Sequence, residues 1–197
     1  MAPQAPDPET SAPVDSALSA APPSARLRLD LAPGTVDLSP GQVIAGSWRL
    51  VYVAGQGAGG VTWRATRIAD EQDVALKVVF RRGVDGVRLG NLLREAAFLC
   101  ELRHPNIVRY LGVIDLPETP GTWLVTEWVG GGELGEWVER FGPATPVVAT
   151  MLLLQLTDAL EFLHERGILH RDVKPGNVLV RLSDSGPPHL LLADFGI

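Results

Sequence analysis

The chain has 197 residues, of which 46% are hydrophobic and 20% charged, a balance typical of a soluble globular protein. Its net charge of −6 argues against a general binder of nucleic acids or membrane surfaces, and we expect neither as a partner. Cys100 is the only cysteine, which excludes a disulfide within the chain and favours a reducing, cytoplasmic location.

The first 45 residues differ in composition from the rest of the chain. They contain eight of the 16 prolines, much alanine and serine, and no helical or strand period. Such a segment cannot bury enough apolar surface to offset the entropy lost on ordering. We therefore predict a disordered leader over residues 1–45.

The next part of the sequence predicts an antiparallel α+β unit. Alternating hydrophobicity predicts strands in SWRLVYVAG (47–55), GVTWRATRI (60–68) and DVALKVVF (73–80). Apolar residues at helical spacing predict a helix over 92–103, and two more strands are predicted over 106–115 and 122–129. Five strands with a helix between the third and fourth form one lobe.

After three glycines at 130–132 the pattern becomes helical. A short helix is predicted over 132–141 and a long one over 145–167, with Gly167 as its stop signal. Two short strands then flank a polar segment, within 168–180 and 189–197. The longest apolar run, 147–156, is too short to span a membrane, so we expect no membrane segment.

Three glycines, Gly55, Gly57 and Gly60, lie between two predicted strands with the spacing G-x-G-x-x-G. Glycines allow the backbone to approach phosphate oxygens and to offer its N–H groups without interference from side chains. The motif alone is weak, because a flexible hairpin has the same composition. A strand follows it rather than a helix, which argues against a dinucleotide-binding turn.

The chain contains only two lysines, and each stands beside residues suited to phosphate chemistry. Lys77 interrupts an apolar strand, where a lone lysine more often reaches solvent, but Glu95 on the next predicted helix could pair with it. Lys174 lies in HRDVKPGN (170–177) with Asp172 and Asn177. Such a carboxylate can accept a proton from an attacking hydroxyl, the ammonium can neutralise phosphate, and the amide oxygen can ligate Mg²⁺.

Asp194 ends the apolar run HLLLA at the close of the chain and offers a hard, anionic oxygen to the same metal. Together, and in this order, these residues resemble a eukaryotic-type (Hanks-type) serine/threonine protein kinase from about Ser47 to Ile197. HPNIV at 104–108 is part of the resemblance. Lysine two positions after Asp172 is typical of the serine/threonine class.

The resemblance implies a protein-kinase-like bilobal fold. Residues 46–129 would form a complete small lobe and a hinge (TEWV, 126–129), and residues 130–197 a partial, mainly helical large lobe. ATP and Mg²⁺ would be the cofactors, and serine or threonine residues of proteins the phosphoryl acceptors. The leader over 1–45 would be dispensable for nucleotide binding.

The resemblance also assigns roles to individual residues. Asp172 would be the catalytic base, Lys174 the phosphate clamp, and Lys77 would hold phosphates while paired with Glu95. Asn177 and Asp194 would ligate the metal. The residues that would contact ATP are Gly55, Gly57, Gly60, Ala75, Lys77, Glu127, Val129, Glu133 and Leu179, with Thr126 as gatekeeper.

The sequence departs from the family pattern in three ways. Thr62 replaces the valine expected after the glycine turn, and Asp194 follows Asn177 by 17 positions, about four more than is usual in the family. Everything that the family places after the segment carrying Asp194 would lie beyond Ile197. We therefore expect roughly the first two-thirds of a kinase domain, less stable than a whole domain and inactive alone.

Two alternatives stay open at this point. One is a nucleotide-binding pseudokinase or regulatory fragment, which the short large lobe favours and the intact Lys77, Asp172 and Asp194 disfavour. The other is a kinase-fold phosphotransferase acting on small molecules, which HRDVKPGN and HPNIV disfavour.

Overall fold

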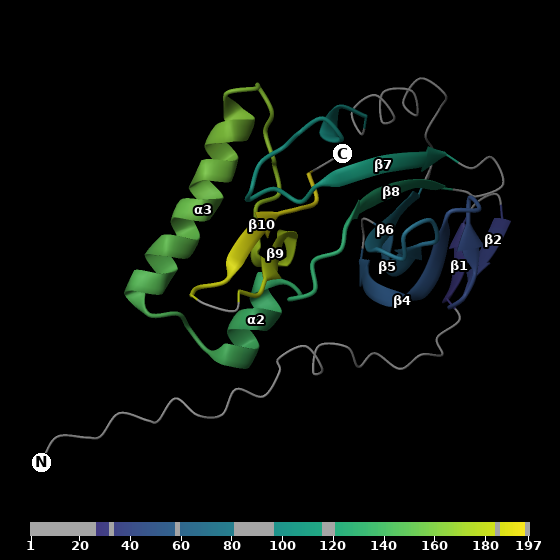
Figure 1. Cartoon of the computed structure of the whole chain (residues 1–197), viewed down its shortest axis with the longest axis horizontal. Coiled ribbons are helices and arrows are strands. Elements are labelled where there is room, and N and C mark those ends of the chain that lie inside the picture. Colours follow the sequence, from purple (N-terminus) through teal and green to yellow (C-terminus); the bar gives the residue numbers. More distant parts are fainter. Residues whose placement is uncertain are drawn as a thin grey trace, which may run out of the picture.

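The computed structural model describes residues 27–31, 34–57, 60–80, 97–115, 121–183 and 186–195. A sheet-rich small lobe leads into a large lobe in which two described helices accompany a two-stranded sheet (Figure 1). The two lobes lie side by side, and the segment preceding β7 and the segment following β8 both cross between them (Figure 1). The bilobal arrangement implied by the resemblance is confirmed.

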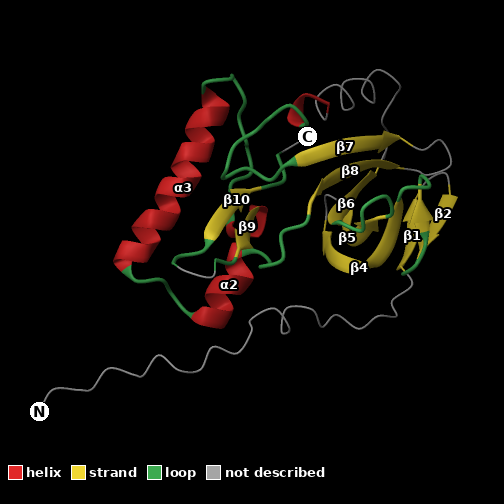
Figure 2. Cartoon of the chain, viewed as in Figure 1, coloured by secondary structure: helices red, strands yellow, loops and turns green. Residues whose placement is uncertain are grey.

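The small lobe is built on a six-stranded antiparallel sheet in the order β3-β4-β5-β6-β8-β7. Figure 2 shows that the sheet is strongly curled. Its strands are β3 (Val43–Ile44), β4 (Trp48–Gly57), β5 (Gly60–Arg67), β6 (Asp73–Phe80), β7 (Tyr110–Asp115) and β8 (Gly121–Glu127). All five strands predicted from alternation are present, and β3 is an addition to them.

The period of two along these strands creates the small-lobe core. On β5, Trp63 and Ala65 are fully buried, and on β6, Val74 and Leu76 are buried on the same face. Trp123 from β8 packs with them. Because successive side chains of a strand point to opposite faces, the intervening residues of β6 are left for the other side of the sheet.

The prediction of a disordered leader is wrong for the part of it that the structure describes. Strands β1 (Leu27–Leu31) and β2 (Gly34–Leu38) pair as an antiparallel hairpin, and β3 joins the sheet. Leu38 and Ile44 are 1% and 4% exposed and pack into the small-lobe core beside Leu50. Composition averaged over 45 residues conceals these two anchors, since proline and alanine dominate the average. Residues 1–26 lie outside the described residues.

The helix predicted over 92–103 falls partly outside the described residues. Positions 97–99 are helical, and the helix ends there rather than at 103. Successive i to i−3 hydrogen bonds close its last turn, from Cys100 N–H to Ala97 O (3.1 Å) and from Leu102 N–H to Leu99 O (3.2 Å). This tightening turns both Leu99 and Leu102 into the core between the lobes.

The large lobe contains α2 (Leu134–Phe141), α3 (Pro146–His164), β9 (Val178–Arg181) and β10 (His189–Leu192). Thr145 caps α3 by accepting a hydrogen bond from Val148 N–H, with Pro146 at the first helical position. Leu152, Ala159 and Leu163 form the buried face of α3 and pack in the core that also holds residues of β9 and β10. The two helices and two strands agree with the predicted order.

By length and composition, α3 is a helix that could cross a membrane, and three of its 19 residues are buried. Its sequence nevertheless contains Asp158 and Glu161, and its buried face belongs to the core of the large lobe. The expectation of no membrane segment therefore stays a prediction.

The packing of β2 and β3 generates a test of the corrected leader. We expect Leu38→Ala to lower the free energy of unfolding by about 3 kcal/mol, because it leaves a cavity in the small-lobe core. Val43→Ala is the matched control, since Val43 is exposed on the neighbouring strand, and it should cost at most about 0.5–1 kcal/mol. Urea unfolding followed by tryptophan fluorescence measures both. Equal and small effects would contradict the packing of Leu38 in the core and favour the predicted disordered leader.

Candidate active site

A cleft open to solvent lies between the lobes, with about 910 Å³ of unfilled space. Every strand of the sheet from β4 to β8 contributes to its wall, together with the hinge, β9 and the residues after β10. The lining residues are Ala54, Gly55, Thr62, Ala75, Lys77, Val108, Tyr110, Leu124, Thr126, Glu127, Trp128, Val129, Gly132, Glu133, Glu136, Gly176, Leu179, Ala193 and Asp194.

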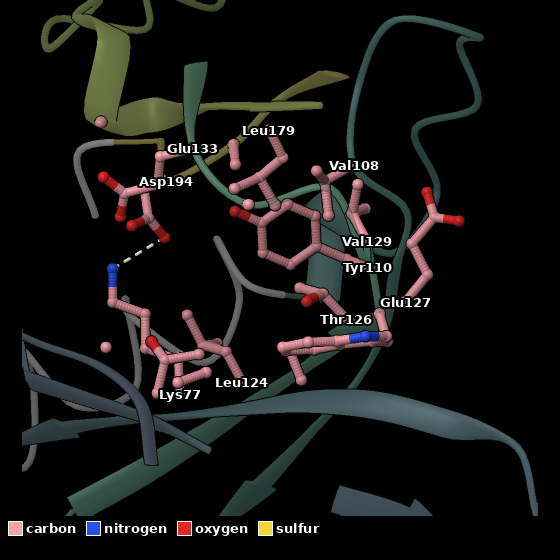
Figure 3. Close-up of a pocket in the computed structure, with 18 of the residues that line it drawn as sticks. Lys77, Val108, Tyr110, Leu124, Thr126, Glu127, Val129, Glu133, Leu179 and Asp194 are labelled. Atoms are coloured by element: carbon pink, nitrogen blue, oxygen red, sulfur yellow. Dashed lines mark ion pairs between the residues drawn. The ribbon is translucent and has the colours of Figure 1, made fainter. Parts of the chain in front are cut away.

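One end of the cleft is apolar. Val108, Val129, Leu191 and Ala193 form a buried cluster against which Leu179 packs. Ala75 faces this cluster from the small lobe, so Ala75 and Leu179 line the cleft from different lobes, as the resemblance implied. Figure 3 shows Leu179, Val108 and Val129 grouped on one side of the space. This end suits a flat, apolar ring.

The hinge presents main-chain groups to that end. Val129 is 5% exposed, yet its N–H and C=O have no hydrogen-bond partner among the described residues. Buried main-chain groups are rarely left unpaired, so a ligand with a donor and an acceptor on one edge would suit this position. The side chain of Glu127 points away from the cleft (Figure 3), where its carboxylate binds Arg109 N–H (3.0 Å) and Arg181 Nη2 (2.7 Å).

Two of the glycines at 130–132, which the sequence suggested only as a boundary between lobes, allow the hinge to pack against β9. A Cβ at Gly131 would lie 2.0 Å from the carbonyl oxygen of Val180, which is far inside contact distance. Val180 N–H donates to Gly132 O (2.9 Å), and Gly132 has a φ of +75°. The glycines therefore let the hinge approach β9 closely.

The other end of the cleft is charged. Lys77 on β6 forms an ion pair with Asp194, with Nζ 2.7 Å from Oδ1, and this contact crosses the cleft from one lobe to the other (Figure 3). The two side chains are 22% and 43% exposed, so water reaches both. Glu95 lies outside the described residues, and its pairing with Lys77 stays a prediction.

The backbone around Asp194 turns its carboxylate back toward the cleft. Asp194 has a φ of +57°, in the left-handed region that non-glycine residues rarely adopt. The preceding residue is held on both sides, because Ala193 N–H donates to Asn177 O (2.8 Å) and Ala193 O accepts from His170 Nε2–H (2.8 Å). Asn177 and Asp194 are thereby brought together although 17 positions separate them.

Asp172, Lys174 and Asn177 converge as the sequence predicted, beside the cleft rather than in its lining. Asp172 Oδ2 accepts from Lys174 Nζ (2.6 Å) and from Asn177 Nδ2 (2.9 Å). The hydrogen bond from Lys174, and then that from Asn177, hold the pKa of the Asp172 carboxyl below its ordinary value. The other oxygen, Oδ1, has no partner among the described residues, which leaves it available to a hydroxyl group.

The donor set fits a magnesium ion that is partly ligated by phosphate. Asn177 Nδ2 donates to Asp172 O (2.7 Å) as well as to Oδ2, so the orientation of the amide leaves Asn177 Oδ1 as a ligand oxygen. Asp194 adds carboxylate oxygens. Among the described residues no group of three or more His, Cys, Asp or Glu could hold a metal. Mg²⁺ commonly takes one or two protein oxygens and completes its shell with phosphates and water.

Glu133 lies in the cleft wall at the start of α2. Its main-chain N–H donates to Glu136 Oε2 (3.4 Å), and the two residues form a capping box. Burial raises the pKa of the Glu133 carboxyl, and the nearby carboxylates of Glu136 and Asp194 raise it further. This placement is compatible with the ribose contact that the resemblance implied.

The glycine turn is only partly assigned by the structure. Gly55 lines the cleft, whereas Gly57 and Gly60 pair with each other at the tip of the β4–β5 hairpin and do not line it. Gly60 has a φ of +129°, a conformation that requires glycine. Residues 58 and 59 lie outside the described residues, so the phosphate-covering role stays a prediction.

Several lining residues were missed by the sequence analysis. Leu124 shares the strand period of Thr126 on β8 and could have been found from it. Nothing in the local sequence marked Tyr110 as a cleft residue, because it lies at the first position of β7. Its ring packs 5.8 Å from that of Phe195, and burial raises the pKa of its hydroxyl. Tyr110 thus connects the sheet to the residue that follows Asp194.

Comparison with known proteins agrees with this geometry. The profile of the protein kinase domain matches residues 48–197. Because the match covers most of the chain, including the hinge, the HRDVKPGN segment and Asp194, the chain belongs to the protein kinase domain family.

Its relatives are serine/threonine kinases. The chain is 37% identical over 155 residues to the serine/threonine-protein kinase PkaA of Streptomyces coelicolor, covering 73% of this chain and 28% of PkaA. It is 36% identical over 144 residues to human serine/threonine-protein kinase ULK3, covering 72% of this chain and 29% of ULK3. The chain therefore spans less than a third of the length of these relatives.

A solved structure is similar over the same region. The crystal structure of Rad53 1-466 in complex with AMP-PNP superposes with a TM-score of 0.68 at 32% identity, covering 77% of this chain and 38% of the Rad53 1-466 chain. The kinase-like fold class predicted from the sequence is confirmed.

The environment of Asp172 generates a testable pKa difference. We expect carboxyl NMR titration to give Asp172 a pKa below the ordinary value of about 3.9, and Lys174→Met to raise it, because the larger stabilising hydrogen bond is lost. Arg140→Met, which removes a cation from α2 outside the cleft lining, is the control and should leave this pKa unchanged. An Asp172 pKa that is the same in Lys174→Met as in the wild type would contradict the observed contact.

Proposed function

We propose that this chain binds Mg·ATP in the interlobe cleft as the nucleotide-binding part of a protein kinase that phosphorylates serine or threonine residues of proteins. One observation carries the proposal. The apolar end of the cleft lies beside Val129, whose N–H and C=O have no partner among the described residues. It adjoins the charged end, where Lys77 and Asp194 form an ion pair. The kinase relatives and the AMP-PNP complex of Rad53 support it.

Each residue of the charged end has a chemical role in this proposal. Lys77 and Lys174 bind phosphate oxygens, and Asn177 and Asp194 hold Mg²⁺, which supplies positive charge to the transferring phosphoryl group. Asp172 is ionised at neutral pH, and its Oδ1, which has no hydrogen-bond partner among the described residues, orients the acceptor hydroxyl and takes its proton. Such positioning provides most of the catalysis in phosphoryl transfer.

Nucleotide binding can be tested separately from transfer. Trp128 lines the cleft, so its fluorescence should change on titration with Mg·ATP. We expect Lys77→Met to weaken binding about 10- to 100-fold, because a hydrogen bond to a charged group is lost. Asp194→Asn should remove most of the dependence on Mg²⁺. Arg140→Met serves as the control, and equal affinity in all variants would contradict the proposed site.

Transfer is tested with radiolabelled ATP, a generic protein substrate and Asp172→Ala as the blank. The expectation that the 197-residue chain is inactive alone stays a prediction. It would be wrong if label reached serine or threonine at more than about 1 s⁻¹ above the blank, as in ordinary kinases.

The two alternatives make different predictions in these assays. Binding of Mg·ATP that is unaffected by Asp172→Ala, with no transfer in any longer form of the protein, would favour a regulatory nucleotide-binding role. Transfer to a small molecule in preference to protein would favour the phosphotransferase alternative. We also propose a cytoplasmic location, which the single free cysteine supports.

A further inference from the structure

Strand β10 leads directly to Asp194, and its two edges have different partners. Along one edge, β9 pairs with it in antiparallel register, with Leu190 opposite Val180 and Leu192 opposite Val178. The other edge meets a segment that comes from the small lobe. There Leu192 N–H donates to Asn106 O (2.8 Å), and Leu192 O accepts from Val108 N–H (3.0 Å).

At Leu190, two residues before Leu192, amide side chains bind the main-chain groups that a neighbouring strand would otherwise bind. Leu190 N–H donates to Gln155 Oε1 (2.8 Å), and Leu190 O accepts from Asn106 Nδ2 (2.9 Å). Both main-chain groups of Leu190 on this edge are therefore satisfied by amide side chains. Leu190 is 0% exposed, so water cannot easily take their place.

Gln155 is the centre of this arrangement. Its Oε1 also accepts from Asn106 Nδ2 (3.0 Å), and its Nε2 donates to Pro188 O (3.2 Å). It comes from α3, which packs beside β10 (Figure 1). The Gln155 side chain thus joins α3 to the segment that precedes β7, to Pro188 just before β10 and to Leu190 within it.

The consequences for the site follow from the short distance along the chain. Leu192 precedes Ala193, whose N–H and C=O are held by Asn177 and His170, and Asp194 comes next with its left-handed backbone. A change in the placement of β10 is passed to the Asp194 carboxylate, since only three residues separate Leu190 from Asp194. Among the described residues, the hydrogen bonds of Gln155 reach β10 and the segment before β7 and do not reach the hinge or β6.

We propose that Gln155 is a positioning residue for the metal-binding carboxylate of Asp194, acting through the hydrogen bonds that hold Leu190 of β10 against Asn106 and α3. This inference rests on the proposed function. Gln155 does not line the cleft. It would act as an outer support of the metal site, that is, a residue that holds a ligating residue in place without contacting the metal. Outer supports of this kind typically change metal affinity or activity by about 10- to 100-fold when removed.

The test compares two ligands of the 197-residue chain. Adenosine needs the apolar end of the cleft and the hinge, whereas Mg·ATP also needs Asp194. Gln155→Met keeps the length of the side chain and removes its hydrogen bonds. We expect it to reduce the preference for Mg·ATP over adenosine about tenfold, because only Mg·ATP uses the Asp194 carboxylate. Thr157→Ala, an exposed change on the same helix, is the matched control and should leave the preference unchanged.

A purely structural role for Gln155 would lower the melting temperature and leave the preference between the two ligands intact, and that result would overturn the proposal. Failure of the wild-type chain to bind either ligand would instead overturn the proposed function. If Gln155→Met does not fold, hydrogen exchange of the wild-type protein decides. The Leu190 N–H should exchange as slowly as the Leu192 N–H. Exchange of the Leu190 N–H at the rate of an exposed amide would contradict the inference.

Discussion

The ion pair between Lys77 and Asp194 links the lobes across the cleft, and the geometry of the site depends on it. Alternation along β6 turns Ala75 and Lys77 toward the cleft, while the left-handed backbone of Asp194 turns its carboxylate toward Lys77. Both charged groups are partly solvated, so the pair contributes little to stability by itself. A weak, direct contact suits two lobes that must admit a ligand, because ligand charges can replace it at small cost.

The placement of β10 sets the apolar and the charged ends of the cleft together. Leu191 and Ala193 belong to the apolar cluster, and Asp194 is the next residue along the chain. Since side chains alternate along a strand, a slip of one residue would exchange Leu191 with a neighbour and move the carboxylate as well. The register with β9 on one edge and with the segment at 106–108 on the other excludes such a slip. One short strand therefore fixes two different chemical environments.

Local patterns were sufficient to predict most of the strands, both large-lobe helices and the charged residues of the site, because these depend on neighbouring residues. Leu38 and Ile44 were missed because the proline-rich composition of residues 1–45 outweighed short apolar stretches, and because their partner Leu50 lies on a different strand. Gln155 and Asn106 look like ordinary polar surface residues. They are 49 positions apart, and their shared role appears only once α3 lies beside β10. Contacts between residues far apart in the sequence could not be predicted, because a single sequence carries no local signal for them.

The balance of charge in the cleft bears on the proposed binding of a nucleotide together with a divalent cation. Each of the two lysines is already paired with a carboxylate, Lys77 with Asp194 and Lys174 with Asp172. Glu133 adds a third carboxylate to the same end, and its raised pKa reflects both burial and the nearby negative charges. A free triphosphate would meet more negative than positive groups, so repulsion would oppose its entry. In the proposed complex, a divalent cation held by the oxygens of Asn177 and Asp194 would reverse that balance. The same carboxylates that would repel the free nucleotide would then attract its magnesium complex, so the proposed function requires the metal for binding as well as for chemistry.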